Sequence, residues 1–155
     1  MRIDSNNLPI METFYSVQGE GFYSGKPAFF IRVGGCDVGC HWCDVKESWD
    51  HGDHEIISVD EIISNVIGTN LVIITGGEPL MWNMNILTKK LKENKMKVHL
   101  ETSGAYKISG KWDWICLSPK KQKLPENEIY ELANELKIII HNKNDLKFAL
   151  QESKK

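Results

Sequence analysis

The sequence predicts an α/β fold in which a mostly parallel sheet is rolled into a partial TIM-type barrel, formed by a single domain over residues 1–155. Three observations support this fold. Apolar segments typical of strands alternate with segments of helical periodicity. Two of the apolar segments end on a Gly-Gly pair. Polar and flexible residues follow each predicted strand, as they do where binding loops gather at the carboxyl ends of parallel strands.

The first elements are a strand, a long loop and a helix. Residues 27–33, PAFFIRV, are rich in aromatic and branched side chains and stop at a Gly-Gly pair, which predicts a strand before a tight loop. Residues 36–54 are polar and are expected to form that loop. A helix is predicted to begin after Ser58, a candidate N-cap, because Glu61 follows three residues later as in a capping box.

The second half of the chain continues the alternation. Residues 71–75, LVIIT, are apolar throughout, which is typical of a strand buried on both faces of a parallel sheet. Period and composition predict the remaining elements in order: a helix at 84–94, strands at 97–101, 112–117 and 136–140, and a last helix at 144–151.

Charge and hydropathy exclude several classes of protein. The 19 basic and 21 acidic side chains give a formal net charge of −2, so no excess of positive charge attracts nucleic acid or an anionic membrane. The chain contains no apolar run near the ~18 residues that a membrane-spanning helix needs. A cytoplasmic protein that binds neither nucleic acid nor membrane is therefore expected.

Three of the four cysteines lie within eight residues, and their spacing is C-x3-C-x2-C. Closely spaced thiols indicate metal or redox chemistry rather than a disulfide framework. Cys36, Cys40 and Cys43 could hold three irons of a 4Fe–4S cluster and leave the fourth iron without a protein ligand. The remaining cysteine, Cys116, is expected to be a small core residue, as His99 is expected to be structural.

Zinc is the alternative metal for this loop. Zinc sites normally have four ligands in tetrahedral geometry and often contain paired C-x2-C sequences, of which this chain has one. The fourth ligand could come from one of four nearby side chains: His41, His51, His54 or Asp44.

A second motif, Gly76-Gly77-Glu78-Pro79, follows the cysteine loop by one predicted helix and one predicted strand. Backbone carbonyls at a glycine turn, together with a carboxylate, favour a bound ammonium group. The two motifs in this order resemble those of radical S-adenosylmethionine enzymes. The resemblance implies a cluster whose open iron binds S-adenosylmethionine and reductively cleaves it to methionine and a 5′-deoxyadenosyl radical.

Further segments resemble the 7-carboxy-7-deazaguanine synthase family over most of the chain: FYSVQGEG (14–21), GKPAFFIR (25–32), WCD (42–44), ETSG (101–104), LSPK (117–120) and ELK (135–137). The resemblance implies a carbon–nitrogen lyase of queuosine and deazapurine biosynthesis. Such an enzyme converts 6-carboxy-5,6,7,8-tetrahydropterin to 7-carboxy-7-deazaguanine with loss of ammonia. It also implies a homodimer and an electron donor such as flavodoxin.

The family motifs assign binding residues to this chain and no catalytic residue beyond the ligands of cofactor and substrate. The cluster ligands would be Cys36, Cys40 and Cys43. S-adenosylmethionine would be held by Trp42, Asp44, Gly76, Gly77, Glu78, Ser118 and Lys120. The pterin would be bound by Val17, Gln18, Gly19, Arg32 and Thr75. Arg32 would clamp the substrate carboxylate, although an arginine on a strand can also simply pair with a nearby carboxylate.

The sequence departs from the family pattern in two places. Family members carry Thr or Ser after the Cys-Asp pair, where the hydroxyl helps to bind magnesium. Val45 stands at that position and has no oxygen to offer, which argues against the same magnesium site. Family members also continue beyond the ELK strand to close the barrel, so the expected site is either more open or completed by a partner subunit.

Two other functions use the same cysteines. A glycyl-radical activase also has a cluster loop with three cysteines, but the segments 18–20 and 118–120 argue against it. A zinc-binding adaptor module would use the thiols structurally, and would be colourless with no cleavage of S-adenosylmethionine.

Overall fold

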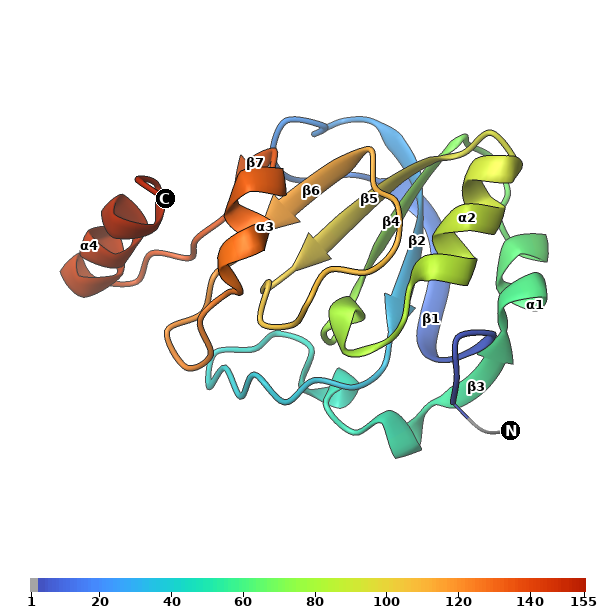
Figure 1. Cartoon of the computed structure of the whole chain (residues 1–155), viewed down its shortest axis with the longest axis horizontal. Coiled ribbons are helices and arrows are strands. Elements are labelled where there is room, and N and C mark those ends of the chain that lie inside the picture. Colours follow the sequence, from blue (N-terminus) through green and yellow to red (C-terminus); the bar gives the residue numbers. More distant parts are fainter. Residues whose placement is uncertain (1–2) are drawn as a thin grey trace.

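The computed structural model describes residues 3–155 and contains a seven-stranded mixed sheet with the order β3-β1-β2-β4-β5-β6-β7 (Figure 1). The strands are β1 (Asn7–Val17), β2 (Pro27–Val33), β3 (Glu55–Ser58), β4 (Leu71–Gly76), β5 (Lys97–Thr102), β6 (Trp114–Leu117) and β7 (Glu135–Leu136). Neighbouring strands in the series β2-β4-β5-β6-β7 pair in parallel, whereas β1 is antiparallel to both of its neighbours, β3 and β2. The sheet is open at β3 and β7, and the predicted α/β class is confirmed.

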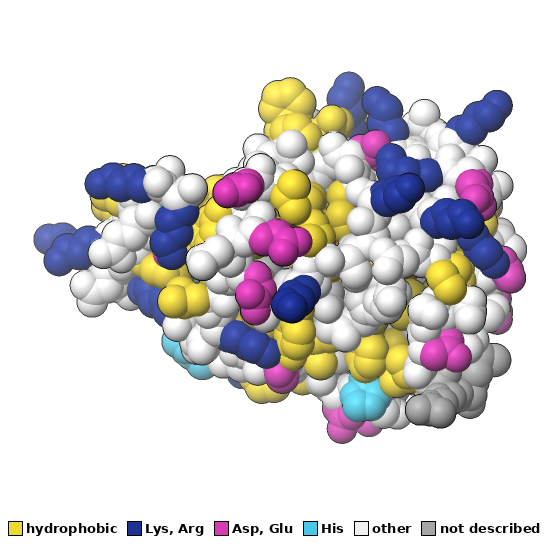
Figure 2. All heavy atoms as spheres, in the orientation of Figure 1, with side chains coloured by type: hydrophobic (Ala, Val, Ile, Leu, Met, Phe, Trp, Pro, Cys, Tyr) yellow, Lys and Arg dark blue, Asp and Glu magenta, His cyan; other side chains and the backbone are white. Residues whose placement is uncertain are grey.

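The helices are short and follow the strands. They are α1 (Val59–Ser64), α2 (Asn85–Glu93), α3 (Asn127–Leu132) and α4 (Lys143–Glu152), with 3-10 turns at Lys46–Ser48, His51–Asp53 and Pro79–Met81. Within the described part of the chain, none of these helices has the length and apolar character required to span a membrane. Acidic and basic side chains are interspersed on the face shown in Figure 2.

Several elements form where the local sequence pattern predicts them. Strand β2 has the predicted bounds, and the predicted strands at 71–75 and 97–101 each gain one residue. Ser58 caps α1, because its side chain accepts a hydrogen bond from the backbone N–H of Glu61. The predicted helix at 84–94 is α2 together with its two cap residues.

The predicted strand at 136–140 is wrong for most of its length. Strand β7 contains two residues and ends at Leu136, while Ile139 and Ile140 are about half exposed. An apolar run forms a strand only where a neighbouring strand continues beside it. Strand β6 ends at Leu117, opposite Leu136, so the residues after Leu136 have no partner strand there.

Two strands and one helix have no clear sequence signal. Strand β1 contains Pro9, which cannot donate a ladder hydrogen bond, and its residues do not alternate cleanly between apolar and polar. Strand β3 has four residues, and α3 has six. These elements depend on tertiary packing more than on local propensity.

The two faces of the sheet differ in character. One face packs against α1 and α2 through a cluster of buried side chains that includes Ile31, Val72, Ile74, Leu87 and Leu91. The other face, here called the open face, has one side chain per strand in lateral register: Arg32, Thr75, Glu101, Cys116 and Glu135. Paired residues of neighbouring strands point to the same side, so this row crosses the sheet from β2 to β7.

Candidate active site

The three clustered cysteines lie in the loop that follows β2, at the carboxyl ends of the parallel strands. Their side chains contribute to one apolar cluster with Val38 and Ala105, against which Trp42 and Tyr106 pack. The loop is held locally by the Cys43 N–H, which donates to the Cys40 carbonyl at 3.0 Å. All of the thiols are free.

The chemistry of this loop suits an iron–sulfur cluster. Burial raises the pKa of the Cys36 and Cys40 thiols, and the neighbouring thiols add to the effect. Bound iron takes the place of the thiol proton and removes this cost. Among residues 3–155, no three or more His, Cys, Asp and Glu side chains converge to hold a single metal ion. A cubane cluster does not require its ligands to converge on one ion, because each thiolate binds a different iron.

The glycine turn after β4 lies directly against the cysteine loop. The Gly77 N–H donates to the Val33 carbonyl at 2.9 Å, and the Glu78 N–H donates to the Gly35 carbonyl at 2.8 Å. A Cβ atom on Gly77 would lie 2.2 Å from the Gly35 oxygen, so only glycine fits this contact. The two motifs, separated by 33 positions between Cys43 and Gly76 in the sequence, therefore belong to one site.

Glu78 is completely buried, and protein donors surround its carboxylate. Oε1 accepts hydrogen bonds from the Leu80 N–H and from the Thr102 hydroxyl, at 3.0 and 2.5 Å. Oε2 accepts from the N–H and hydroxyl of Ser103, at 2.8 and 2.5 Å. The side chain thus joins the carboxyl end of β4 to that of β5, a structural role that the motif alone does not indicate.

A pocket of about 290 Å³ brings two of the predicted cofactor residues together. Trp42 and Lys120 line it, with Pro119, Ile139 and Phe148 among the other lining residues. The Lys120 ammonium donates to the Ser118 carbonyl and hydroxyl, at 2.7 and 2.5 Å. Asp44, by contrast, is exposed and does not line this pocket.

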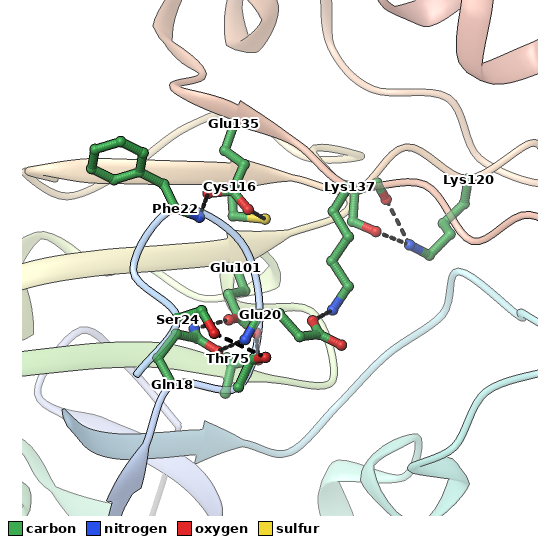
Figure 3. Close-up of polar contacts among 12 residues, drawn as sticks. Gln18, Glu20, Phe22, Ser24, Thr75, Glu101, Cys116, Lys120, Glu135 and Lys137 are labelled. Atoms are coloured by element: carbon green, nitrogen blue, oxygen red, sulfur yellow. Dashed lines mark hydrogen bonds and ion pairs between the residues drawn. The ribbon is translucent and has the colours of Figure 1, made fainter. Parts of the chain in front are cut away.

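The predicted substrate residues meet on the open face, as Figure 3 shows for Gln18 and Thr75. Glu101 connects them: its Oε1 accepts from the Gln18 amide nitrogen at 2.9 Å, and its Oε2 accepts from the Thr75 hydroxyl at 2.9 Å. Arg32 lies beside Thr75 in the β2–β4 register. The side chain of Val17 and the backbone of Gly19 are exposed at the start of the loop that joins β1 to β2.

Arg32 also makes the simpler contact that an arginine on a strand can make. Its Nε lies 3.2 Å from Glu12 Oε1, and its guanidinium lies 5.8 Å from the centre of the Phe14 ring. Both partners belong to β1, and both help to hold the guanidinium beside the open face.

A second pocket, of about 340 Å³, lies between the open face and the loop that joins β1 to β2. His99 and Cys116, expected to be inert core residues, are buried but line this pocket. Burial lowers the pKa of His99 to about 4, and its Nε2 is buried without a hydrogen-bond partner in the structure. Burial, with the charge of Glu135, raises the pKa of Cys116 to about 12.

Sequence reasoning missed Glu101, Glu135 and Lys137 as residues of this site. The ELK and ETSG segments attract notice only as family likeness, and no local pattern shows that their side chains turn toward Gln18. Only the parallel register of β4, β5, β6 and β7 brings them there.

Comparison with known proteins agrees with this geometry. A family model described as "Radical SAM superfamily" matches residues 30–113. The 7-carboxy-7-deazaguanine synthase of Flavobacterium psychrophilum is 56% identical over 96% of this chain and 71% of its own length. That of Synechocystis is 52% identical over 96% of this chain and 73% of its own length. The crystal structure of QueE from Escherichia coli superposes with a TM-score of 0.84 at 30% identity, covering 95% of this chain and 76% of that one.

The cysteine loop, the glycine turn and the matched family model define a radical S-adenosylmethionine enzyme. Such enzymes use a 4Fe–4S cluster and S-adenosylmethionine. Within that superfamily, the chain belongs to the 7-carboxy-7-deazaguanine synthases. The relatives favour this lyase over the glycyl-radical activase and the zinc-binding module.

Proposed function

We propose that this enzyme converts 6-carboxy-5,6,7,8-tetrahydropterin to 7-carboxy-7-deazaguanine and ammonia. The observation that carries the proposal is the network in which Glu101 joins Gln18 to Thr75, with Arg32 in the neighbouring register position. These side chains come from the β1–β2 loop and three different strands, and they share one face of the sheet.

The cofactor end of the site is the carboxyl rim of the sheet. Cys36, Cys40 and Cys43 would ligate the cluster, which supplies the electron for reductive cleavage of S-adenosylmethionine. Gly76 and Gly77 offer backbone groups to the methionine end of that cofactor. Because the Glu78 oxygens already accept four hydrogen bonds, Glu78 would serve mainly to fix this turn in place.

The nucleoside end of the cofactor would lie in the pocket lined by Trp42 and Lys120. An indole face suits a stacked adenine, and Ile139 and Phe148 add apolar surface to the pocket, which Lys121 and Asp145 also line. The hydrogen bonds from Lys120 connect Ser118 to this pocket, which Lys120 lines. Asp44, exposed beside Cys43, is assigned to the cofactor by the WCD motif and lies outside this pocket.

The substrate end of the site is the open face. The terminal nitrogens of Arg32 supply a planar fork for the substrate carboxylate, while its Nε faces Glu12. The Thr75 hydroxyl and the backbone of residues 17–19 offer donors and acceptors to the pterin edge. Glu101 holds Gln18 and Thr75 at a fixed separation, so the two contacts are arranged before the substrate arrives.

Three further features follow from the resemblance. We infer that magnesium is not held through a side-chain hydroxyl after Asp44, because Val45 offers no oxygen. A homodimer and a flavodoxin-like electron donor are proposed as partners. Neither nucleic acid nor a membrane surface is proposed as a partner, because the formal net charge of −2 gives no excess of positive charge to attract them.

One experiment tests the proposed function. The protein is reconstituted anaerobically with iron and sulfide, reduced, and given S-adenosylmethionine with and without 6-carboxytetrahydropterin. We expect a brown cluster, cofactor cleavage and 7-carboxy-7-deazaguanine in the complete mixture. An intact cluster that cleaves the cofactor but forms no 7-carboxy-7-deazaguanine would refute the proposal.

A further inference from the structure

The loop between β1 and β2, residues 18–26, reaches across the open face to the far edge of the sheet (Figure 3). Its aromatic side chains lie over β5 and β6. The Tyr23 ring meets His99 of β5 edge-on at 4.4 Å, and the Phe22 ring stacks on Trp114 of β6 at 5.1 Å. The loop therefore covers one end of the open face and forms the outer wall of the pocket of about 340 Å³.

Glu135 of β7 anchors the middle of this loop. Its Oε2 accepts a hydrogen bond from the Phe22 N–H at 3.1 Å and another from the Trp114 indole N–H at 3.2 Å. The approach is close because Gly21 has no side chain. A Cβ atom there would lie 1.8 Å from the other Glu135 oxygen, and the Gly21 φ of +68° also favours glycine.

Lys137, two residues later, anchors the start of the loop by an ion pair with Glu20. Burial lowers the pKa of Lys137, but the contact with Glu20 and the charge of Glu101 outweigh burial and raise it overall. The ammonium therefore stays charged at neutral pH. Both anchors come from the segment 135–137, at the β7 edge of the sheet, which is separated from β2 by three strands.

These anchors determine where the substrate-facing part of the loop lies. Gln18 is bonded to Glu101, and Glu101 is bonded to Thr75, so the loop and the proposed substrate contacts form one continuous network. Within the loop, the Gln18 carbonyl accepts from the Gly25 N–H at 2.8 Å, which couples its two ends. A shift at Phe22 or Glu20 would therefore move the backbone of residues 18 and 19.

We propose that Glu135 and Lys137 are positioning residues that set substrate affinity by holding the 18–26 loop over the open face. The proposal rests on the proposed function, because it takes residues 17–19 as part of the pterin site. Neither residue touches the cysteine loop in the contacts described above. Their loss should therefore affect substrate binding rather than the cluster or S-adenosylmethionine.

The test compares Glu135→Ala and Lys137→Met with two matched controls on the helical face, Glu93→Ala and Lys90→Met. Each control removes one member of a surface ion pair, Lys89–Glu93 or Lys90–Asp60. We expect the KM for 6-carboxytetrahydropterin to rise about 10- to 100-fold in both test variants, the size of effect that misplacing a bound group produces. Iron content and cofactor cleavage without substrate should stay at wild-type values, and the controls should match wild type.

A second readout does not depend on activity. Hydrogen–deuterium exchange of the amides in residues 18–26 should speed up in both test variants and stay unchanged in both controls. If Glu135→Ala does not fold, Glu135→Gln replaces it: the amide keeps an acceptor for Phe22 but loses the charge, and a smaller rise in KM is expected.

The outcomes separate the two proposals. Wild-type protein that neither binds nor converts the pterin overturns the proposed function, and the exchange data still decide whether the anchors hold the loop. If wild type is active, an unchanged KM in the test variants refutes the positioning role, whether or not the loop exchanges faster. A loss of iron in these variants also refutes it.

Discussion

The carbonyl oxygen of Gly35 lies where a side chain on Gly77 would begin, since a Cβ atom built there stands 2.2 Å from that oxygen. Gly35 precedes the first cysteine of the cluster loop, and Gly77 belongs to the turn proposed to hold the methionine end of the cofactor. The cysteine loop and the cofactor turn are thus held in close contact through backbone atoms of Gly35, Gly77 and Glu78.

Substitution of Gly77 by Ala tests this contact. The methyl group would push the turn away from Gly35 and weaken the hydrogen bond from the Glu78 N–H, so unfolding free energy should fall by about 1–3 kcal/mol. Urea denaturation measures the change, and iron content after reconstitution should also fall. Gly19→Ala is the stability control because a Cβ atom there meets nothing within 4 Å. Equal stability of the two variants would contradict the prediction.

Removal of the Glu78 carboxylate should destabilise the fold strongly. Glu78→Ala leaves four buried or partly buried donors without their acceptor, and the expected cost is about 3 kcal/mol or more in unfolding free energy. Glu93→Ala, on an exposed helix face, should cost less than about 0.5 kcal/mol. A loss below about 1 kcal/mol in Glu78→Ala would show that the network contributes little.

His99 should make stability depend on pH in the acid range. The unfolded chain binds the imidazole proton near pH 6.5, whereas burial lowers the pKa in the folded protein to about 4. Between these values the unfolded state holds more protons, so stability falls as the pH drops from 6.5 to 4, by up to about 3 kcal/mol.

His99→Leu should lose this part of the pH dependence, and urea denaturation between pH 4 and 7 measures it. His141→Gln, at an exposed position, should keep the wild-type slope. The opposite result, a wild-type slope in His99→Leu, would show that other groups cause the acid loss. Asp113 and Glu135 oppose the lowering of the His99 pKa, so their protonation belongs in the fit.

Cys40→Ala should abolish the brown chromophore of the reconstituted protein. The substitution removes one of the three proposed thiolate ligands, and the two that remain are too few to hold the cluster. Iron and sulfide analysis, with the visible absorption spectrum, measures the loss. Cys116→Ser is the matched control, since Cys116 lies on β6 beside Glu135 and away from the loop. Full iron content in Cys40→Ala would refute its assignment as a ligand.

Val45→Thr should make turnover respond to magnesium. The new hydroxyl would stand next to Asp44 and restore an oxygen ligand of the kind that a hard cation prefers. Turnover is compared with and without magnesium in Val45→Thr, in wild type, whose valine has the shape of threonine without the hydroxyl, and in the smaller control Val45→Ala. If the three proteins respond alike, magnesium does not bind at this position.

The sequence predicts the cofactors, a 4Fe–4S cluster and S-adenosylmethionine, because the information that indicates them is local. Three cysteines in one loop, and two glycines at the end of a strand, belong to short segments whose chemistry can be recognised without a fold. The parallel register then brings the segments together, as the hydrogen bonds from Gly77 and Glu78 show.

The substrate half could be predicted only in part. Gln18, Arg32 and Thr75 come from the family resemblance, but Glu101, Glu135 and Lys137 gain their roles from contacts with residues far away in sequence. The antiparallel strand β1, which positions the loop, also lacks a sequence signal because Pro9 interrupts its pattern. No periodicity argument reveals which polar side chains will face one another across four strands.

The long reach of the 18–26 loop also has a consequence for how the enzyme is made. Gln18 and Glu101 are 83 residues apart in sequence, and Phe22 and Glu135 are 113 apart. During synthesis the loop therefore leaves the ribosome well before its anchors, because Glu135 follows Phe22 by 113 residues. We expect the loop to stay mobile until β7 pairs with β6, because contacts of such long range form late in folding. The segment proposed to contact the substrate therefore becomes ordered only after β7 has formed, although it is synthesised more than 100 residues earlier.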